Sequence, residues 1–422
     1  MLLLLLVVLS LLSGCSSRQP ETAGSGDTSR ISAGDARALE QRILDERARA
    51  IRERREALFL RHVDRSDAAL LARQRRYFRN LVQLPLATFR YQVRETQWEG
   101  QGDSQTFPRR WGRDVRIPQV RLSVQLDGYD AVPVQRTVGF AFSFADGKAT
   151  IVSDRSAKGA LLFLGTPQPW DLTSIRVVQG QGVLGIFDRS TASLGETLVS
   201  TVSSGITQLD ARLPFSWADH VVVYSVADRR VLSSFTDVPG GSIEHLGALT
   251  FPTYAAAAGR SKVASTRMLV MPTSVRAGQP FLGRITRHEL SHVAIGSRDD
   301  GSPTWVSEGI AEYLGAREIP QPARIIATEA LARAQSPVAG LPVSEDFNDT
   351  DQEWHYALSW MAVDYIAATY GEGRMWELME AMSNGGSGTP DADQDRVLQQ
   401  VLGYDAAELA KRAAARIRQI YG

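Results

Sequence analysis

The segment that most constrains this chain of 422 residues is His288-Glu289-Leu290-Ser291-His292. Positions i and i+4 lie on one face of an α-helix, one turn apart, so a helix here lets both histidines reach a single metal ion. Glu289 stands beside them, where its carboxylate can act on metal-bound water. The chain has only six histidines, which makes this spacing uncommon by chance. The alternative is an ordinary amphipathic helix whose histidines form hydrogen bonds.

A second segment, which carries two glutamates, follows at residues 305–313, Trp-x-x-Glu-Gly-x-Ala-Glu-Tyr. Two histidines leave a catalytic zinc ion one protein ligand short, because such sites use three ligands and a water. The segment resembles the second motif of the gluzincin zinc peptidases, and more narrowly of the peptidase MA-like group. This resemblance covers residues 194–422. It implies that Glu308 is the third ligand and that Glu312 hydrogen-bonds a zinc-binding histidine, fixing its tautomer. A surface carboxylate paired with an arginine is the alternative for Glu312.

The same resemblance indicates where the remaining parts of an active site would lie. Gluzincins use a tyrosine or histidine from the later helices to stabilise the developing oxyanion, which favours Tyr356, with His355 in reserve. Both residues can instead be packing residues at a helix start. An edge strand before the metal helix would align the substrate backbone, and Met268 to Met271 is the candidate.

Apolar periodicity divides the folded chain into two parts and predicts an α+β fold. Residues 35–80 have helical spacing, and alternation with a period of two follows from Phe89 to Phe144, with further strands up to Phe187. We therefore expect a domain at 35–188 with a leading helix and a curved antiparallel sheet. It resembles nuclear transport factor 2-like or cystatin-like domains, and no motif assigns it a chemistry. A mainly helical, thermolysin-like zincin domain with a small sheet should occupy 189–422.

Charge gives little guidance about partners. The net charge is zero, so there is no general electrostatic case for nucleic acid binding. The helical stretch at 35–80 is rich in arginine. It can contact anionic phospholipid, or it can be a solvated helix face with internal ion pairs, which is the more common role.

The beginning of the chain has the pattern of a targeting segment. Residues 1–12 are almost all Leu and Val, a run too short to span a bilayer but long enough for a signal peptide. Leu12-Ser13-Gly14-Cys15 resembles the bacterial lipobox, which implies a signal peptide at 1–14 and acylation of Cys15, by palmitate among other chains. An uncleaved apolar tail or a plain secretory signal is the alternative. Cys15 is the only cysteine, so the fold has no intrachain disulfide. Residues 15–34 are small and polar and should form a flexible tether.

Together these features predict a lipid-anchored zinc peptidase on the extracytoplasmic face of the cell membrane. It would bind one Zn²⁺ and hydrolyse a peptide or protein substrate, with Glu289 as general base. Its other partner would be membrane lipid, through acylated Cys15. An inactive peptidase relative that binds zinc and serves as an envelope binding or scaffold lipoprotein is the alternative, although retention of Glu289 argues against inactivation.

Overall fold

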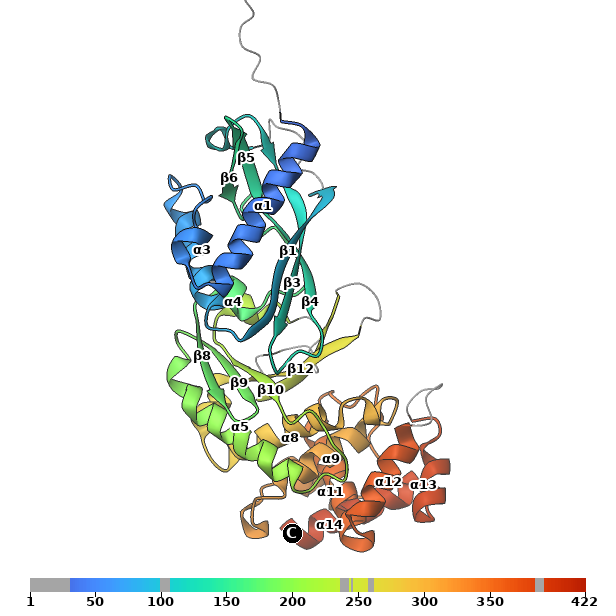
Figure 1. Ribbon diagram of the computed structural model, residues 1–422. Helices are drawn as coiled ribbons and strands as arrows, with labels where there is room; N and C mark the ends of the chain where they lie inside the picture. Colours follow the sequence, from blue (N-terminus) through green and yellow to red (C-terminus); the bar gives the residue numbers. More distant parts are fainter. Residues whose placement is uncertain (1–30, 99–106, 236–242, 244–245, 257–261, 384–390) are drawn as a thin grey trace, which may run out of the picture.

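The computed structural model describes residues 31–98, 107–235, 243, 246–256, 262–383 and 391–422. The chain forms an elongated molecule, with the N-terminal helices and sheets at one end and the C-terminal helices at the other (Figure 1). Its mixture of antiparallel sheets and helices confirms the α+β prediction. The predicted signal peptide, Cys15 and nearly all of the tether lie outside the described residues. Within those ranges, no helix combines the length and apolar character needed to cross a bilayer.

The first part packs helices against two antiparallel sheets. Its helices are α1 (Ala33–Arg52), α2 (Glu56–Phe59), α3 (Ala68–Leu81), η2 (Arg109–Trp111) and α4 (Pro169–Leu172). Its strands are β1 (Leu86–Gln97), β2 (Val115–Arg116), β3 (Pro118–Leu126), β4 (Val134–Gly139), β5 (Ala141–Ala145), β6 (Lys148–Ser153) and β7 (Phe163–Leu164). One sheet has the order β1-β3-β4-β7 and the other β2-β5-β6, so the chain changes sheet at Phe140 instead of continuing one curved sheet.

Local sequence explains the helices of this part. The Ser32 and Asp67 side chains accept hydrogen bonds from backbone N–H groups at the start of α1 and α3, which satisfies donors that have no partner inside the helix. Apolar residues at helical spacing, among them Leu44 and Ile51, put one face of α1 into a core shared with Tyr91 of β1. The helical prediction for residues 35–80 is therefore confirmed, with a break after Arg52 and a turn before α3.

A five-stranded sheet joins the first part to the helices that follow. Its order is β11 (Ala248–Tyr254), β12 (Val263–Val270), β10 (Val221–Ser225), β9 (Val183–Asp188) and β8 (Ile175–Gly180). Strand β10 pairs in parallel with β9 and β12, and the crossover from β9 to β10 contains helix α5 (Gly195–Asp210). The prediction that the strands up to Phe187 belong to the first sheet is wrong, because β8 pairs with β9, and β9 pairs with β10 and not with a strand of the first part. The proposed division at 188/189 separates two strands that pair directly.

Both faces of the central strands β9 and β10 are buried, which is why these two strands read as nearly continuous apolar runs. Leu184 and Tyr224 lie in the core of the first part. Their neighbours in sequence, Val183 and Val223, point to the other face and lie in the core of the helical part. The sheet therefore couples the two parts through one layer of alternating side chains.

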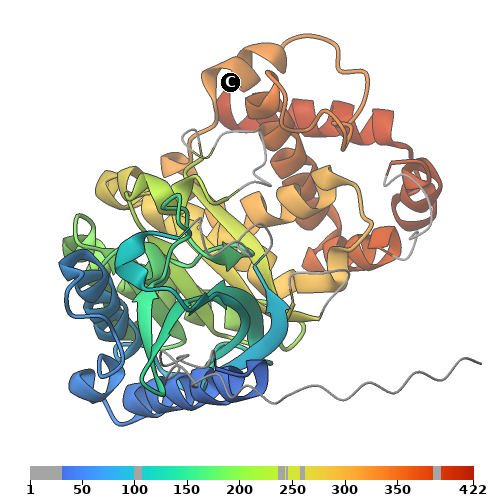
Figure 2. The same cartoon turned by 90° about the horizontal axis from the view of Figure 1, so that it is seen from above.

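The last part is helical and lies beyond this sheet (Figure 2). Its helices are α7 (Pro272–Ala277), α8 (Phe281–Ile295), α9 (Thr304–Ala316), α10 (Thr328–Arg333), α11 (Gln352–Tyr370), α12 (Glu372–Ser383), α13 (Gln394–Leu402) and α14 (Ala406–Tyr421). Helix α6 (Arg229–Leu232), which follows β10, packs instead on the core of the first part through Val231. Short 3-10 turns are η3 (Ala192–Leu194), η6 (Gly296–Asp299) and η7 (Gln321–Ala323).

Helix α9 packs closely against both α8 and α11 because two glycines face these neighbours. A Cβ atom at Gly309 would lie 2.6 Å from the Ser359 carbonyl oxygen of α11. One at Gly315 would lie 3.0 Å from the Arg284 carbonyl oxygen of α8. Because α9 lies so close to α8, the carboxylates of α9 lie close to the histidines of α8.

Candidate metal centre

Helix α8 forms as the sequence predicts and ends at Gly296, whose backbone N–H donates to the His292 carbonyl oxygen. Gly296 has a φ of 58°, a conformation that a residue without a side chain adopts readily. The guanidinium of Arg287 donates two hydrogen bonds to the Gly315 carbonyl oxygen, at 3.1 Å and 2.7 Å. The position of α8 relative to the end of α9 is therefore held by a buried cation.

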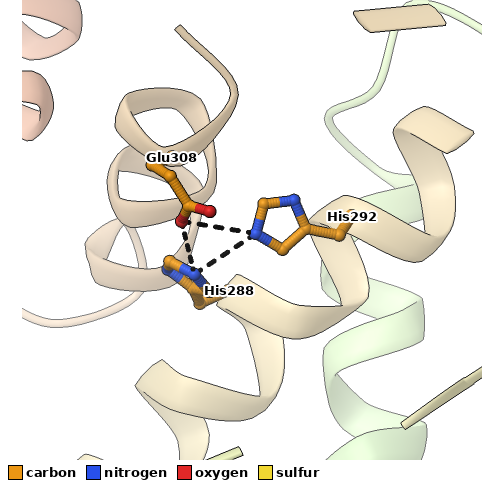
Figure 3. Close-up of side chains that lie close together, drawn as sticks. All are labelled: His288, His292 and Glu308. Carbon is orange, nitrogen blue, oxygen red and sulfur yellow. Dashed lines mark hydrogen bonds and ion pairs between the residues drawn. The ribbon is translucent and has the colours of Figure 1, made fainter. Parts of the chain in front are cut away.

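His288, His292 and Glu308 converge on one point between these helices (Figure 3). The Nε2 atoms of the two histidines are 3.3 Å apart. Oε2 of Glu308 lies 3.3 Å from Nε2 of His288 and 3.5 Å from Nε2 of His292. The structure thus brings together the two histidines that spacing predicted and the glutamate that the family resemblance implied.

The chemistry of these three atoms fits a metal ion. Oε2 of Glu308 is buried and has no hydrogen bond of good geometry to any described residue. Buried polar atoms are nearly always satisfied, so an atom of this kind needs another partner. Imidazole nitrogens and a carboxylate oxygen are together a suitable ligand set for a transition metal. The group can therefore bind one metal ion.

The charges in the cluster are strongly coupled. Burial acts to raise the pKa of Glu308, but His292 and His288 outweigh burial and hold that pKa far below its usual range. Burial acts to lower the pKa of His288, but contacts with Glu308 and Glu312 raise it well above its usual value. The carboxylates thus create a site of negative potential that favours a cation, whether a proton or a metal ion.

Glu312 supports the first histidine from the side away from Glu308. Its Oε1 lies 3.2 Å from Nδ1 of His288, and its Oε2 accepts from Nη2 of Arg284 at 2.5 Å. Burial opposes ionisation of Glu312, but His288 and Arg284 lower its pKa to about 2. This arrangement matches the role that the resemblance implied and also contains the arginine pairing of the alternative.

Arg284 is a site residue that the sequence interpretation missed. It lies one turn before His288 on the same helix, and its guanidinium carbon lies 4.4 Å from the Trp360 ring centroid. A stacked and ion-paired arginine has little freedom to move. The i, i+4 spacing from Arg284 to His288 was the available signal.

Asp299, in η6 after α8, is a second site residue that the sequence interpretation missed, and no motif in the sequence pointed to it. Burial raises its pKa, and nearby His292 acts in the opposite direction. A carboxylate thus lies close enough to interact electrostatically with the second histidine.

Two expected catalytic groups lie near the cluster. Glu289 is buried on α8, and its charge acts on both His292 and Tyr356. The Tyr356 ring centroid lies 6.3 Å from that of His288. Burial, reinforced by the three glutamates of the site, raises the pKa of Tyr356, so its phenol keeps its proton.

His355, the reserve candidate, is turned away from the cluster. Its Nδ1 lies 2.9 Å from the Phe347 carbonyl oxygen and 3.7 Å from Oδ1 of Asp349. Of the two neighbours at the start of α11, the structure brings only Tyr356 to the histidines.

The edge strand beside helix α8 is β11. The prediction of Met268 to Met271 is wrong, because β12 lies between β10 and β11. Strand β11 pairs on one side with β12 and is the last strand on that side of the described sheet. Thr250 Oγ1 of β11 donates to the Glu289 carbonyl oxygen at 3.2 Å, which ties this strand to α8.

Comparison with models of known protein families found no family that matches the chain, and comparison with curated proteins found no match.

Proposed function

We propose that this chain is a zinc-dependent peptidase of the gluzincin type, with His288, His292 and Glu308 as the zinc ligands. The single observation that carries the proposal is the convergence of these three side chains next to Glu289. Tetrahedral ligands at zinc–ligand distances of about 2.1 Å lie about 3.4 Å from one another. The three measured separations, 3.3, 3.3 and 3.5 Å, fit that geometry.

The donor set favours zinc over harder cations. Calcium and magnesium prefer all-oxygen ligands in larger number, whereas two imidazoles and one carboxylate are the ligands of many hydrolytic zinc sites. Three protein ligands leave a position for water or substrate. When bound, zinc would supply Lewis-acid polarisation and a water of lowered pKa.

Other residues of the site would each have a separate catalytic role. Glu289 accepts a proton from the attacking water and delivers it to the leaving amine. The neutral phenol of Tyr356 donates a hydrogen bond to the developing oxyanion. Glu312, held by Arg284, orients His288. The free edge of β11 offers backbone groups that can align an extended peptide.

The location of this activity is a separate part of the proposal. The Leu12-Ser13-Gly14-Cys15 segment supports an acylated cysteine and a protein anchored outside the cell membrane. Two or more acyl chains would hold it firmly, since one chain gives only marginal binding. Mass measurement of the mature N-terminus tests this part without reference to activity.

The decisive experiment compares the wild-type chain with Glu289→Gln on a peptide library. Loss of a positioned general base should lower kcat by a factor of about 10² to 10⁴ while bound zinc stays stoichiometric. Glu318→Gln is the matched control, because Glu318 pairs with Arg212 outside the cluster. A chelator should abolish cleavage, and zinc should restore it.

Three results would count against this function. If Glu289→Gln cleaves like the wild type, the peptidase proposal fails. Zinc bound by a wild-type chain that cleaves no peptide would support the inactive scaffold. Equal zinc content in the wild type and in His288→Ala would reject the metal site.

A further inference from the structure

A pocket separate from the metal centre lies in the first part of the chain, where no motif predicted a chemistry. It has a volume of about 330 Å³ and is formed by α3, β4, β7 and α6. This volume is at the lower end of the range of small-molecule sites. It shares no lining residue with the metal centre, and an inference about it does not rest on the proposed function.

The interior of this pocket is largely apolar. Aromatic and aliphatic side chains from three elements line it, including Tyr77 of α3, Val138 of β4 and Phe163 of β7. Leu161 also lines the pocket and is 40% exposed. Because this leucine is exposed, the apolar lining of the pocket extends to the molecular surface.

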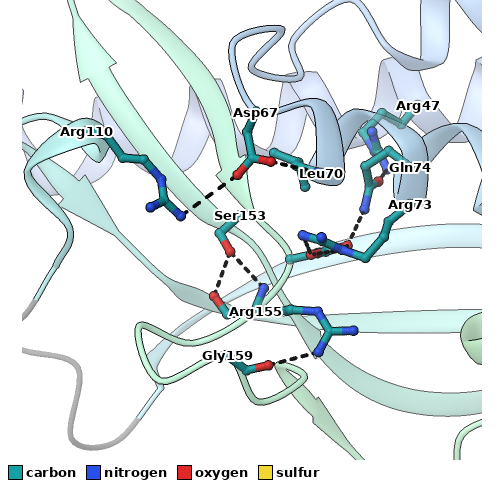
Figure 4. Close-up of polar contacts among 10 residues, drawn as sticks. Arg47, Asp67, Leu70, Arg73, Gln74, Arg110, Ser153, Arg155 and Gly159 are labelled. Carbon is teal, nitrogen blue, oxygen red and sulfur yellow. Dashed lines mark hydrogen bonds and ion pairs between the residues drawn. The ribbon is translucent and has the colours of Figure 1, made fainter.

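Four arginines and two aspartates also line the pocket, so its lining carries a positive excess. Most of the arginines have partners. Arg73 makes a bidentate contact with Asp154, and Gln74 donates to the same carboxylate (Figure 4). Arg155 donates to the Gly159 carbonyl oxygen at 2.8 Å, also seen in Figure 4. Arg230 pairs with Asp228 at 2.6 Å, outside the lining.

Arg76 is the exception. Its Nε is buried and makes no hydrogen bond, and in the described part of the chain its guanidinium forms no ion pair. Burial lowers the pKa of Arg76, and the nearby charges of Arg230, Arg73 and Arg155 add to that effect. A partly buried cation among three other cations is costly unless an anion compensates it.

The charge of Asp154 offsets this lowering of the Arg76 pKa only in part, and both of its oxygens already accept hydrogen bonds from Arg73 and Gln74. The unpaired guanidinium beside an apolar hollow therefore has the arrangement of a site that receives its counter-ion from outside.

We propose that this pocket binds a small anionic amphiphile, with its carboxylate or phosphate head on Arg76 and its apolar body against Tyr77, Val138 and Phe163. Arginine suits this role because its planar fork donates two parallel hydrogen bonds to either head group. The amphiphile can be a free molecule or a membrane lipid, and the shared chemistry is an acyl chain with one anionic end.

The test uses the full chain and the fluorescent probe 1-anilinonaphthalene-8-sulfonate, itself an aromatic anion. Octanoate and octyl phosphate should displace the probe, and octanol, with the same chain and no charge, should displace it at least tenfold less well. Arg76→Gln should weaken octanoate about tenfold, the loss expected for one charge-assisted contact, and leave octanol unchanged.

Arg79→Gln is the matched control, since Arg79 lies on the same helix and pairs with Glu56 away from the pocket. It should bind octanoate like the wild type. A second variant, Ser233→Asp, adds a negative charge to the lining and should also weaken octanoate. Unfolding temperatures confirm that each variant is folded.

Equal affinity for octanol and octanoate would overturn the proposal, as would an unchanged octanoate affinity in Arg76→Gln. Binding to vesicles that contain anionic phospholipid distinguishes the two sources. Vesicle binding that depends on Arg76 supports a membrane lipid. Binding of octyl phosphate without Arg76-dependent vesicle binding supports a free ligand.

Discussion

Nδ1 of His288 lies 3.2 Å from Oε1 of Glu312, so helix α9 supplies both a candidate ligand and the carboxylate that orients another. Glu308 and Glu312 are four positions apart and therefore lie on one face of α9. They contact His288 from opposite ring nitrogens, Glu308 at Nε2 and Glu312 at Nδ1. A carboxylate beside Nδ1 favours the tautomer in which Nε2 is free to bind a metal.

Glu312→Gln should weaken zinc binding by a factor of about 10 to 100, because the neutral amide lowers the basicity of His288 and loosens its orientation. Competition with a chromophoric chelator measures the change. Glu318→Gln is again the control and should bind zinc like the wild type. An unchanged zinc affinity in Glu312→Gln would show that the contact is only structural.

Tyr356→Phe should lower kcat by about two orders of magnitude with little change in KM or zinc affinity, since the lost hydrogen bond forms only as the oxyanion develops. The peptide substrate found with the wild type provides the measurement. His355→Gln is the comparison, because His355 contacts the Phe347 carbonyl oxygen and not the cluster. Full activity of Tyr356→Phe would remove Tyr356 from the mechanism.

Gly309→Ala should destabilise the fold by about 1 to 3 kcal/mol, because the new methyl group would lie 2.6 Å from the Ser359 carbonyl oxygen and force α9 and α11 apart. Urea unfolding measures the free energy. Gly373→Ala is the matched control, since no atom lies within 4 Å of its added Cβ in helix α12. A stability equal to that of the wild type would mean that the two helices adjust without cost.

Glu40 should make stability depend on pH. Its side chain is fully buried and neither oxygen has a hydrogen bond. Burial raises its pKa to about 7 from 4.5, although Arg116 opposes the change. The folded state therefore holds this proton more tightly than the unfolded state. The stabilisation of the folded state that comes from this tighter proton binding is largest below pH 4.5 and is lost as the pH rises through 7. It amounts to at most about 3 kcal/mol.

Glu40→Gln should remove that dependence. At pH 8 the variant should be more stable than the wild type, and near pH 4.5 the two should be similar. Urea unfolding at both values tests this. If the wild type and the variant lose stability in parallel between pH 4.5 and 8, another group is responsible.

Local patterns were sufficient for the features that depend on neighbours along the chain. The spacing of His288 and His292 predicts both the helix and the shared face, and Gly296 predicts where that helix ends. Glu308 was correctly associated with the histidines because its motif resembles that of a known family. Helical and strand periodicity also sufficed for the α+β class.

Tertiary structure decided which strands pair and which side chains meet across helices. Nothing local distinguishes β11 from β12 as the edge, or indicates that β9 pairs with β10, since hydrogen bonding between strands joins residues far apart in sequence. The contact of Tyr356 with His288, and the link from Arg284 through Glu312 to His288, show the same limit, because they exist only where α8, α9 and α11 pack together. Periodicity along a chain determines the face of an element, but its partner depends on long-range packing, which no short segment of sequence contains.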